Sequence, residues 1–253
     1  MATFYRLLTP LFFLILGSCF LVACTTDLPP ASMVQVLDCA PRENPNDYLQ
    51  VSLQNYTYTQ GKMMFTPQNI RLGGQTPLLP TRKTSRTNKG LQLHVSVNNQ
   101  QHQLSNENIF DYPLEDGKYD LFAFITDSYE EAIKTPNAIL GRHIEISKGT
   151  LAGSRPIEQV ALVYNLPIGT HEINETDSIL LDFVLYSTQL EEKGNYVSFV
   201  INQQAPIRLD KWQPYYLTGL SEGEHNITMT LNNAAGKPIA TPVNNSFIVK
   251  KPS

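Results

Sequence analysis

One strand-like stretch of sequence occurs twice in this chain, and this repeat constrains the fold more than any other feature. Residues 90–100 (GLQLHVSVNNQ) have a second version at residues 194–204 (GNYVSFVINQQ), offset by 104 residues. A second block, residues 114–121, recurs as residues 220–227 with an offset of 106. The same two blocks in the same order indicate two copies of one structural unit.

The first block alternates apolar and polar residues in the same phase in both copies. The apolar positions are Leu93, Val95 and Val97 in the first copy and Val197, Phe199 and Ile201 in the second. A slip of one residue would turn every apolar side chain to water. The shared phase therefore predicts that both copies pair their strands in the same way.

Short alternating segments separated by Gly, Pro and Asn run through the rest of the chain, which is typical of an antiparallel sandwich. Further strands are expected at residues 33–37, 49–56, 63–72, 142–146, 159–164, 179–186, 206–209 and 247–250. The sequence predicts an all-β protein with two immunoglobulin-like antiparallel β-sandwich domains in tandem. We place these domains at residues 33–150 and 151–253, joined around residues 148–154.

The start of the chain resembles the export signal of a bacterial lipoprotein. Arg6 precedes an apolar stretch at residues 7–23, which is shorter than the roughly 20 residues of a membrane-spanning helix. The sequence LVAC at residues 21–24 resembles a lipobox. This resemblance implies that the signal peptide, residues 1–23, is removed and that Cys24 is acylated, with residues 24–32 as a tether. An uncleaved anchor helix is the alternative.

These features predict a location outside the cytoplasm. Thr25 follows the lipobox cysteine, where an aspartate would favour the inner membrane, so we expect an outer-membrane lipid anchor. The membrane is thus one partner, through the lipid on Cys24. A net charge of −4 without a basic face argues against nucleic acid. Cys39 is the one thiol left in the mature chain, and we expect it to be buried, with a reactive thiol as the alternative.

Several motifs resemble a family of two-domain envelope lipoproteins that is sometimes labelled "phosphopeptide-binding protein". They are LGGQT at residues 72–76, SYEEAIK at 128–134, LDFVLY at 181–186 and LDKWQPY at 209–215. The resemblance implies the sandwich fold, and the label would imply an anion site. Members tend to carry a basic residue in place of Asp127 and a histidine in place of Glu130. Two carboxylates here repel a phosphate, so the sequence disfavours phosphate binding.

No local motif for catalysis or metal binding occurs, and the histidines lie singly in the sequence. We therefore expect no catalytic residue, no cofactor and no metal site. The candidate ligand contacts are Tyr129, Lys134, Trp212, Tyr215 and Tyr216. Core packing is the alternative for the aromatic run, in which alternation predicts that Tyr216 is the most exposed residue.

Three surface features admit two interpretations each. Phe122 and Phe124 face away from the strand's apolar side, so either residues 127–134 or the second domain cover them, or they line an apolar groove. The basic run at residues 82–89 is expected to be a mobile, solvated loop or a contact for lipid headgroups. The acidic turn around residues 111–120 and the pair Glu130 and Glu131 are expected to face solvent, with calcium binding as the alternative for the turn.

Together these observations predict a membrane-anchored, non-enzymatic binding or structural module of the cell envelope, with a protein or glycan partner. The alternative is a carbohydrate- or peptide-binding component of an envelope uptake system. An enzyme is the third and least favoured interpretation, because the sequence shows no compact set of acid, base and nucleophile.

Overall fold

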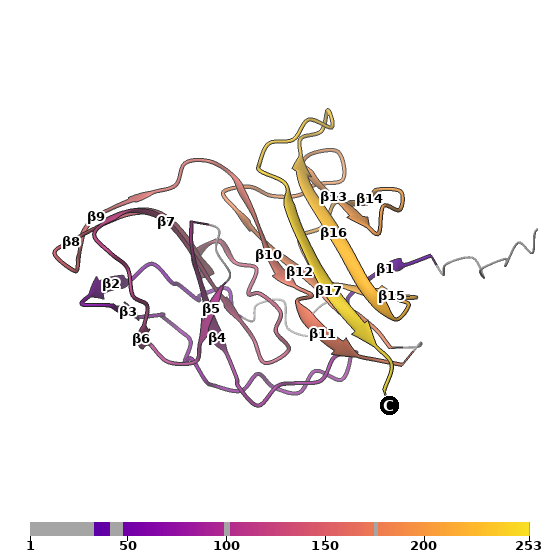
Figure 1. Ribbon diagram of the computed structural model, residues 1–253, viewed down its shortest axis with the longest axis horizontal. Helices are drawn as coiled ribbons and strands as arrows, with labels where there is room; N and C mark the ends of the chain where they lie inside the picture. Colours follow the sequence, from indigo (N-terminus) through magenta and orange to yellow (C-terminus); the bar gives the residue numbers. More distant parts are fainter. Residues whose placement is uncertain (1–32, 41–47, 99–101, 175–176, 253) are drawn as a thin grey trace, which may run out of the picture. The chain divides into compact units, whose positions relative to one another are not determined.

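Two β-sandwiches make up the part of the chain that the computed structural model describes, residues 33–40, 48–98, 102–174 and 177–252 (Figure 1). Within these ranges the chain contains no α-helix, and η1 (Pro136–Ala138) is a short 3-10 helix. The predicted all-β, immunoglobulin-like sandwich fold is confirmed. The predicted signal peptide, Cys24 and the tether lie outside the described residues. No described helix has the length and apolar character needed to cross a membrane.

The first sandwich is one eight-stranded sheet that folds over its own core, in the order β5-β4-β7-β8-β9-β2-β3-β6. Its strands are β2 (Tyr56–Thr59), β3 (Lys62–Phe65), β4 (Gln92–Val97), β5 (Gln103–Ser105), β6 (Ile109–Asp111), β7 (Gly117–Thr126), β8 (Ile139–Ser147) and β9 (Thr150–Pro156). Strands β9 and β2 pair only at Thr150 and Thr59, and the sheet turns into a second layer there. Buried Leu93, Ile125 and Phe65 belong to the shared core.

The second sandwich has a four-stranded sheet, β1-β15-β12-β10, and a five-stranded sheet, β11-β17-β16-β13-β14. Its strands are β1 (Gln35–Asp38), β10 (Ala161–Leu166), β11 (Gly169–Glu172), β12 (Ile179–Tyr186), β13 (Tyr196–Ile201), β14 (Ile207–Leu209), β15 (Tyr215–Thr218), β16 (Gly223–Asn232) and β17 (Val243–Lys250). Phe183 from the first sheet and Phe199 and Phe247 from the second are buried in one core.

The two copies of the repeat pair their strands in the same register, as predicted. The matching pairs are Leu93–Ile125, Val95–Ala123 and Val97–Leu121 in the first copy, and Val197–Leu231, Phe199–Met229 and Ile201–Ile227 in the second. An asparagine with positive φ, Asn98 or Asn202, follows the first strand of each copy. Its side-chain oxygen accepts a hydrogen bond from the backbone N–H of Asp120 or Asn226, respectively. The copies therefore share turn structure as well as strand pairing.

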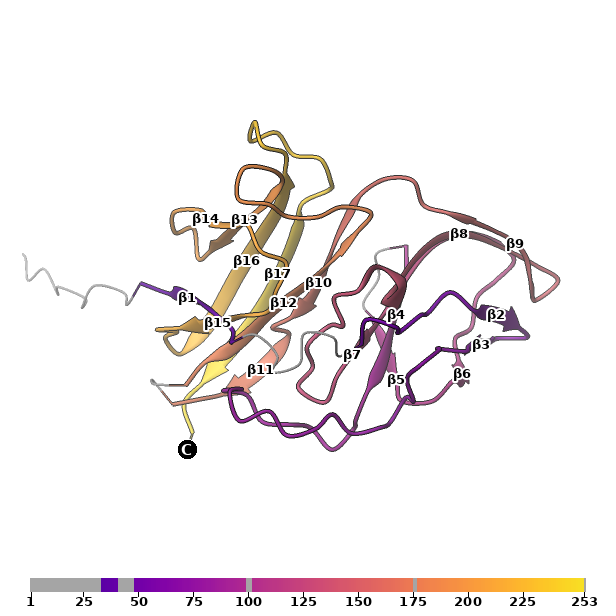
Figure 2. The same ribbon diagram turned by 180° about the vertical axis from the view of Figure 1, so that it is seen from behind.

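Strand β1 pairs with the second sandwich, although the sequence predicted it as part of the first. It lies beside β15 in both views (Figures 1 and 2), and the pairing runs from Gln35 with Thr218 to Asp38 with Tyr215. Val34, just before the strand, is buried in the second core. The partner strand lies at the other end of the chain, so no local pattern could have revealed the pairing.

Other segments also differ from the predicted strands. Residues 148–154, expected to join the two domains, instead form the turn and most of the second strand of the β8–β9 hairpin. Residues 49–56 contain a bridge from Ser52 to Gln68 and the first residue of β2, and β3 ends at Phe65, so most of the two expected strands is loop. Residues Ser32–Ser253 form one compact unit, and the division into domains at residues 150 and 151 stays a prediction.

Candidate functional site

The outer face of strands β4, β7, β8 and β9 has two parts, one covered and one open. One end of this face is covered by the turn at residues 127–134 and by strand β12, and we call this covered area the junction. The other end, on β7, β8 and β9, is open and carries a charged hollow. The sequence-predicted ligand contacts lie at or beside the junction, whereas the hollow was not predicted.

Phe122 and Phe124 are covered at the junction, which agrees with the first of the two interpretations of these residues, burial under a neighbouring segment. Phe124 packs with Ala132 of the turn and Val184 of β12. Phe122 meets the ring of Tyr186 edge to face, with ring centroids 5.7 Å apart. Both the turn and the second sandwich therefore provide the cover, and the turn is not helical. With Phe124 only 2% exposed, the rings do not line an open apolar groove.

A buried ion pair joins the turn to β12. Lys134 Nζ lies 2.5 Å from Asp182 Oδ1, and the two side chains are 12% and 0% exposed. The second carboxylate oxygen of Asp182 accepts hydrogen bonds from Ala132 N and Asn165 Nδ2 at 2.9 and 2.8 Å. Lys134 Nζ also donates to the carbonyl oxygen of Phe183. Lys134, predicted as a ligand contact, thus has its charge neutralised within the protein.

The predicted aromatic contacts are largely interior. Tyr129, Tyr215 and Tyr216 are all under 5% exposed. Trp212 is half-buried and donates its indole N–H to the carbonyl oxygen of Phe183. The expectation that Tyr216 is exposed is wrong, because it packs against Cys39 and accepts a hydrogen bond from the backbone N–H of Lys83. The three tyrosine rings could meet a ligand only if the surrounding contacts opened.

The basic run is anchored to the protein at its first residue. The guanidinium of Arg82 forms an ion pair with Glu131, and both side chains are 2% exposed. Arg82 Nη1 also donates to Ala40 O at 2.5 Å, and Thr87 N donates to Ser128 O at 2.7 Å. The expectations of a purely solvated loop and of a solvent-facing Glu131 are both wrong. Residues 49 positions apart pair here, and alternation along one strand cannot show that.

Asp127 and Cys39 both have roles in packing. The carboxylate of Asp127 accepts hydrogen bonds from Tyr129 N and Glu131 N, which holds the turn in shape. Asp127 is 1% exposed, so it faces no solvent-borne anion. Cys39 is 3% exposed, which confirms its expected burial.

The acidic residues around 111–120 do not converge on one point. Asp111 pairs with Lys62 at 2.7 Å. Asp116 accepts hydrogen bonds from the backbone of Gly149 and Lys148, which lower the pKa of its carboxyl. Asp120 lies on the outer face of β7 and pairs with His143. No group of three metal-ligating side chains occurs among the described residues.

Two histidines lie together beside Phe124, although the sequence separates them by eight positions. The His94 ring stacks on Phe124 with centroids 4.7 Å apart, and His102 meets both rings edge to face. Burial, with the neighbouring His102 as a second cause, lowers the pKa of His94 to about 3. Burial lowers the pKa of His102 to about 4. Both imidazoles are therefore neutral in the folded protein at neutral pH.

This pair predicts a loss of stability in mild acid. The unfolded chain binds a proton at His94 near the ordinary pKa of 6.5, whereas the folded protein does not until about 3. Stability is therefore present above the unfolded pKa and falls as the pH drops toward the folded one. From pH 7 to pH 5, His94 alone should remove about 2 kcal/mol from the free energy of unfolding. Urea titrations of wild type and His94→Gln at both pH values measure this; an equal loss in the variant contradicts it.

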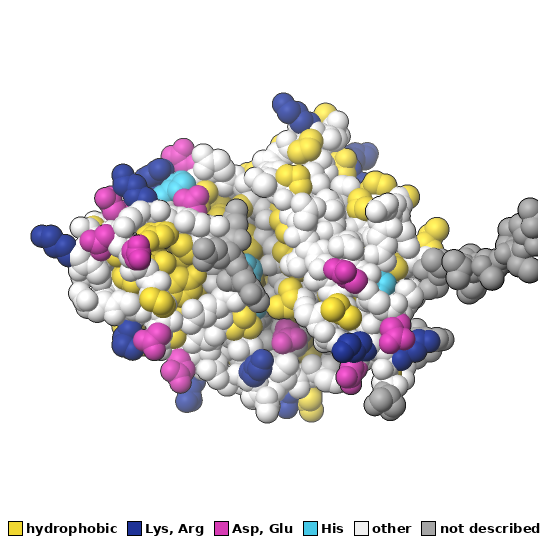
Figure 3. All heavy atoms as spheres, viewed as in Figure 1, with side chains coloured by type: hydrophobic (Ala, Val, Ile, Leu, Met, Phe, Trp, Pro, Cys, Tyr) yellow, Lys and Arg dark blue, Asp and Glu magenta, His cyan; other side chains and the backbone are white. Residues whose placement is uncertain are grey.

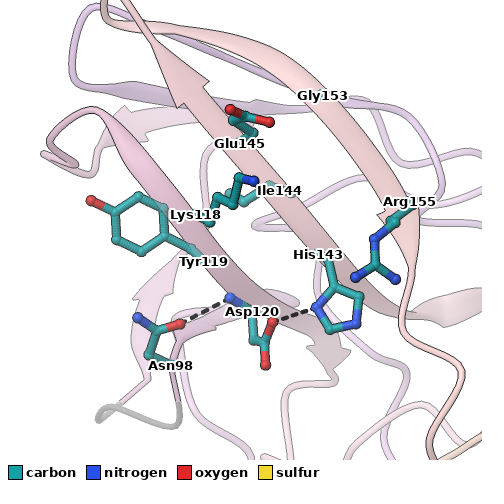
Figure 4. A pocket seen from close by; sticks show the side chains of 9 residues that line it. All are labelled: Asn98, Lys118, Tyr119, Asp120, His143, Ile144, Glu145, Gly153 and Arg155. Atoms are coloured by element: carbon teal, nitrogen blue, oxygen red, sulfur yellow. Dashed lines mark hydrogen bonds and ion pairs between the residues drawn. The ribbon is translucent and has the colours of Figure 1, made fainter.

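The charged hollow lies where strand pairing places six outward positions side by side. Lys118 pairs with Glu145, and Glu145 with Gly153, in one row; Asp120, His143 and Arg155 form the next row. The hollow has a volume of about 450 Å³. Figure 4 shows the side chains of Lys118, Glu145, His143 and Arg155 around it. In Figure 3, basic and acidic side chains surround a histidine over these strands at the upper left.

Gly153 leaves space in the middle of the hollow because it has no side chain. It lies opposite Glu145, and an added Cβ would meet the Glu145 side chain at an ordinary distance of 3.7 Å. The position thus has room for a side chain and lacks one. A hollow results between the flanking charged residues.

The charges in the hollow are only partly paired. His143 Nδ1 lies 2.5 Å from Asp120 Oδ1. An ionised carboxylate only accepts hydrogen bonds, so Nδ1 carries the proton and Nε2 is the remaining polar atom of the ring. Asn98 accepts from the Asp120 backbone N–H and fixes the end of this row. Among the described residues, Lys118, Glu145 and Arg155 form no ion pair within 4.0 Å.

The second copy of the repeat provides an internal comparison for these positions. Its paired outward residues are Glu224 with Ile248 and Asn226 with Ser246, in place of Lys118 with Glu145 and Asp120 with His143. The same strand pairing is therefore built without any cation there. The fold does not require the charges of the hollow, and a comparison of outward residues between the copies could have revealed them from sequence.

Comparison with known proteins finds two solved structures at low similarity. No family model matches the chain, and no curated protein matches it. The fibronectin(III)-like modules of Clostridium thermocellum CbhA share 12% identity, with a TM-score of 0.30, over 87% of this chain and 95% of theirs. Bacteroides ovatus SGBP-B of a mixed-linkage glucan utilization locus, in complex with a heptasaccharide, shares 10% identity, with a TM-score of 0.18, over 86% and 70%. At this similarity, function rests on the chain's own residues.

Proposed function

We propose that this chain is a non-enzymatic recognition module of the cell envelope and that it binds a glycan in the charged hollow. The observation that carries the proposal is the dense array of donors and acceptors on one open sheet face. Lys118 and Arg155 supply N–H donors, Glu145 and Asp120 supply acceptors, and the second ring nitrogen of His143 has no hydrogen bond to any described residue. The second copy of the repeat has the same framework without this array.

A sugar suits this chemistry because each hydroxyl both donates and accepts a hydrogen bond. A surface with donors and acceptors in alternation can satisfy several hydroxyls of one ring at once. Ligand pockets typically measure roughly 300–1,000 Å³, and the hollow falls in this range. Its position on an exposed sheet face, rather than in a closed cavity, leaves room for a chain that continues in both directions.

The binding experiment uses the full-length protein in detergent and a panel of neutral and acidic oligosaccharides, measured by isothermal titration calorimetry. At least one class should bind, and Gly153→Val should weaken its binding by about tenfold or more, because the new side chain fills the hollow. Thr228→Val, a substitution on the matching face of the second copy, is the control and should leave binding unchanged. Absence of binding to the whole panel, or an unaffected Gly153→Val protein, would sink the proposal.

Membrane attachment through a lipid on Cys24 is the second part of the proposal. It is supported by the lipobox-like sequence LVAC at residues 21–24 and the short apolar segment before it. Cys24→Ala should move the protein from the membrane pellet to the soluble fraction after cell lysis. Mass spectrometry of wild type should find acyl chains on Cys24. An intact, unmodified amino terminus on the wild-type protein would contradict the anchor.

A further inference from the structure

We infer that the glycan bound in the hollow is uncharged and that one of its hydroxyl groups donates a hydrogen bond to His143 Nε2. This inference rests on the proposed function and specifies its ligand class. It follows from the balance of charges around the hollow and from the position of the proton on the histidine ring.

The ionised side chains around the hollow balance one another. Its cations are Lys118 and Arg155, and its carboxylates are those of Asp120 and Glu145. Lys118 is the direct cross-strand partner of Glu145, and Arg155 shares its row with Asp120. With its proton on Nδ1, His143 adds no charge. The hollow therefore exerts no net attraction on a charged group, and an acidic sugar would add a third carboxylate to the two already present.

The imidazole of His143 offers the sugar an acceptor and no donor. Its Nδ1–H points to Asp120 Oδ1 at 2.5 Å, so the second nitrogen, Nε2, has only a lone pair. A group that donates a hydrogen bond suits this atom, whereas a carboxylate or an ether oxygen has no proton to give. Figure 4 shows the guanidinium of Arg155 beside the ring. A sugar hydroxyl placed there donates to the imidazole and accepts from the guanidinium.

A shift in strand register beside Gly153 opens the hollow further. Glu145 pairs with Gly153, but the next residue, Ile146, pairs with Leu151. Ala152 is therefore an extra residue in β9, as in a β-bulge, which bends a strand locally. The bend lies directly beside the position that lacks a side chain. Both features provide room for a sugar ring rather than for a single ion.

The deciding experiment compares two forms of the oligosaccharide that the binding panel identifies. One form carries a primary alcohol and the other a carboxylate at the same carbon, obtained by oxidation or reduction. Calorimetry uses the full-length protein in detergent. We expect the neutral form to bind about fivefold or more tightly than the acid. Equal affinities, or tighter binding of the acid, would overturn the inference and leave the proposed function standing. Failure of every oligosaccharide to bind would overturn both.

Two variants with opposite effects on charge separate recognition from a structural role. Glu145→Gln gives the hollow a net positive charge and should raise the affinity for the acid, relative to the neutral form, by about fivefold. Arg155→Gln gives it a net negative charge and should lower the same ratio by about as much. Damage to the fold would weaken both forms together and leave the ratio unchanged. A ratio that stays constant, or that moves in one direction in both variants, would contradict the inference.

The hydroxyl contact is tested at the histidine itself. His143→Phe keeps an aromatic ring but removes the acceptor, so it should weaken binding of the neutral form by about tenfold. His143→Gln supplies an amide oxygen that accepts a hydrogen bond, and it should recover most of this loss. Unchanged binding in His143→Phe, or an equal loss in both variants, would overturn the assignment of this contact.

Discussion

Replacing Asp182 with alanine is expected to lower the free energy of unfolding by about 3–5 kcal/mol. The substitution leaves the Lys134 ammonium, whose side chain is 12% exposed, without its counter-charge. It also removes the acceptor for Ala132 N and Asn165 Nδ2, both buried at the junction. Urea denaturation monitored by tryptophan fluorescence measures the effect, and Trp212 lies close enough to Lys134 to report on the junction.

The matched control is an exposed ion pair of the same type. Lys62 and Asp111 lie 2.7 Å apart, with side chains 58% and 82% exposed. Lys62→Ala should cost less than about 1 kcal/mol, because water already screens that pair. Adding Lys134→Met to Asp182→Ala should recover part of the loss, since it removes the buried charge. If Asp182→Ala costs no more than Lys62→Ala, the junction is not held by this pair.

Phe124→Ala should cost about 3–5 kcal/mol as well, because it empties a site that is packed from both sandwiches. The ring is 2% exposed, packs with Ala132, Ile139 and Val184, and stacks on His94. Thermal or urea unfolding of the variant measures the loss. Removal of the ring also exposes His94 to water, so the variant should lose less stability than wild type when the pH falls from 7 to 5.

Thr230 provides the comparison for this substitution, because it occupies the position of Phe124 in the second copy. It is only half-buried, so Thr230→Ala should change stability by about 0.5 kcal/mol or less. Equal losses for Phe124→Ala and Thr230→Ala would mean that the cover at the junction contributes little.

The repeat was the most reliable guide from sequence to structure, because strand pairing within each copy depends on local alternation. The registers of β4 with β7 and of β13 with β16 follow directly from it. The strand expected at residues 179–186 also has the predicted bounds. Strands β5, β6 and β11, each of three or four residues, were not predicted, since so short a segment carries little periodicity.

Predictions failed where distant segments meet. Tyr216 is buried because residues around Cys39 and Lys83 cover the second face of β15. The sequence alone predicts solvated side chains for Arg82 and Glu131, whereas the fold brings them together as a buried ion pair. The hollow depends on cross-strand neighbours among Lys118, Glu145 and Arg155, which lie up to 37 positions apart. Each of these residues, taken alone, is an ordinary outward-facing residue of a strand. They form a site only because strand pairing places them side by side.

The position of β1 also constrains when this protein can become complete. The strand is synthesised before nearly all of the described chain, yet its partner Thr218 follows Gln35 by 183 residues. Closing so long a loop is slow compared with forming the neighbouring hairpins. On the side of the four-stranded sheet that β1 occupies, β15 therefore has no neighbour until the beginning of the chain returns to a strand that is synthesised almost last.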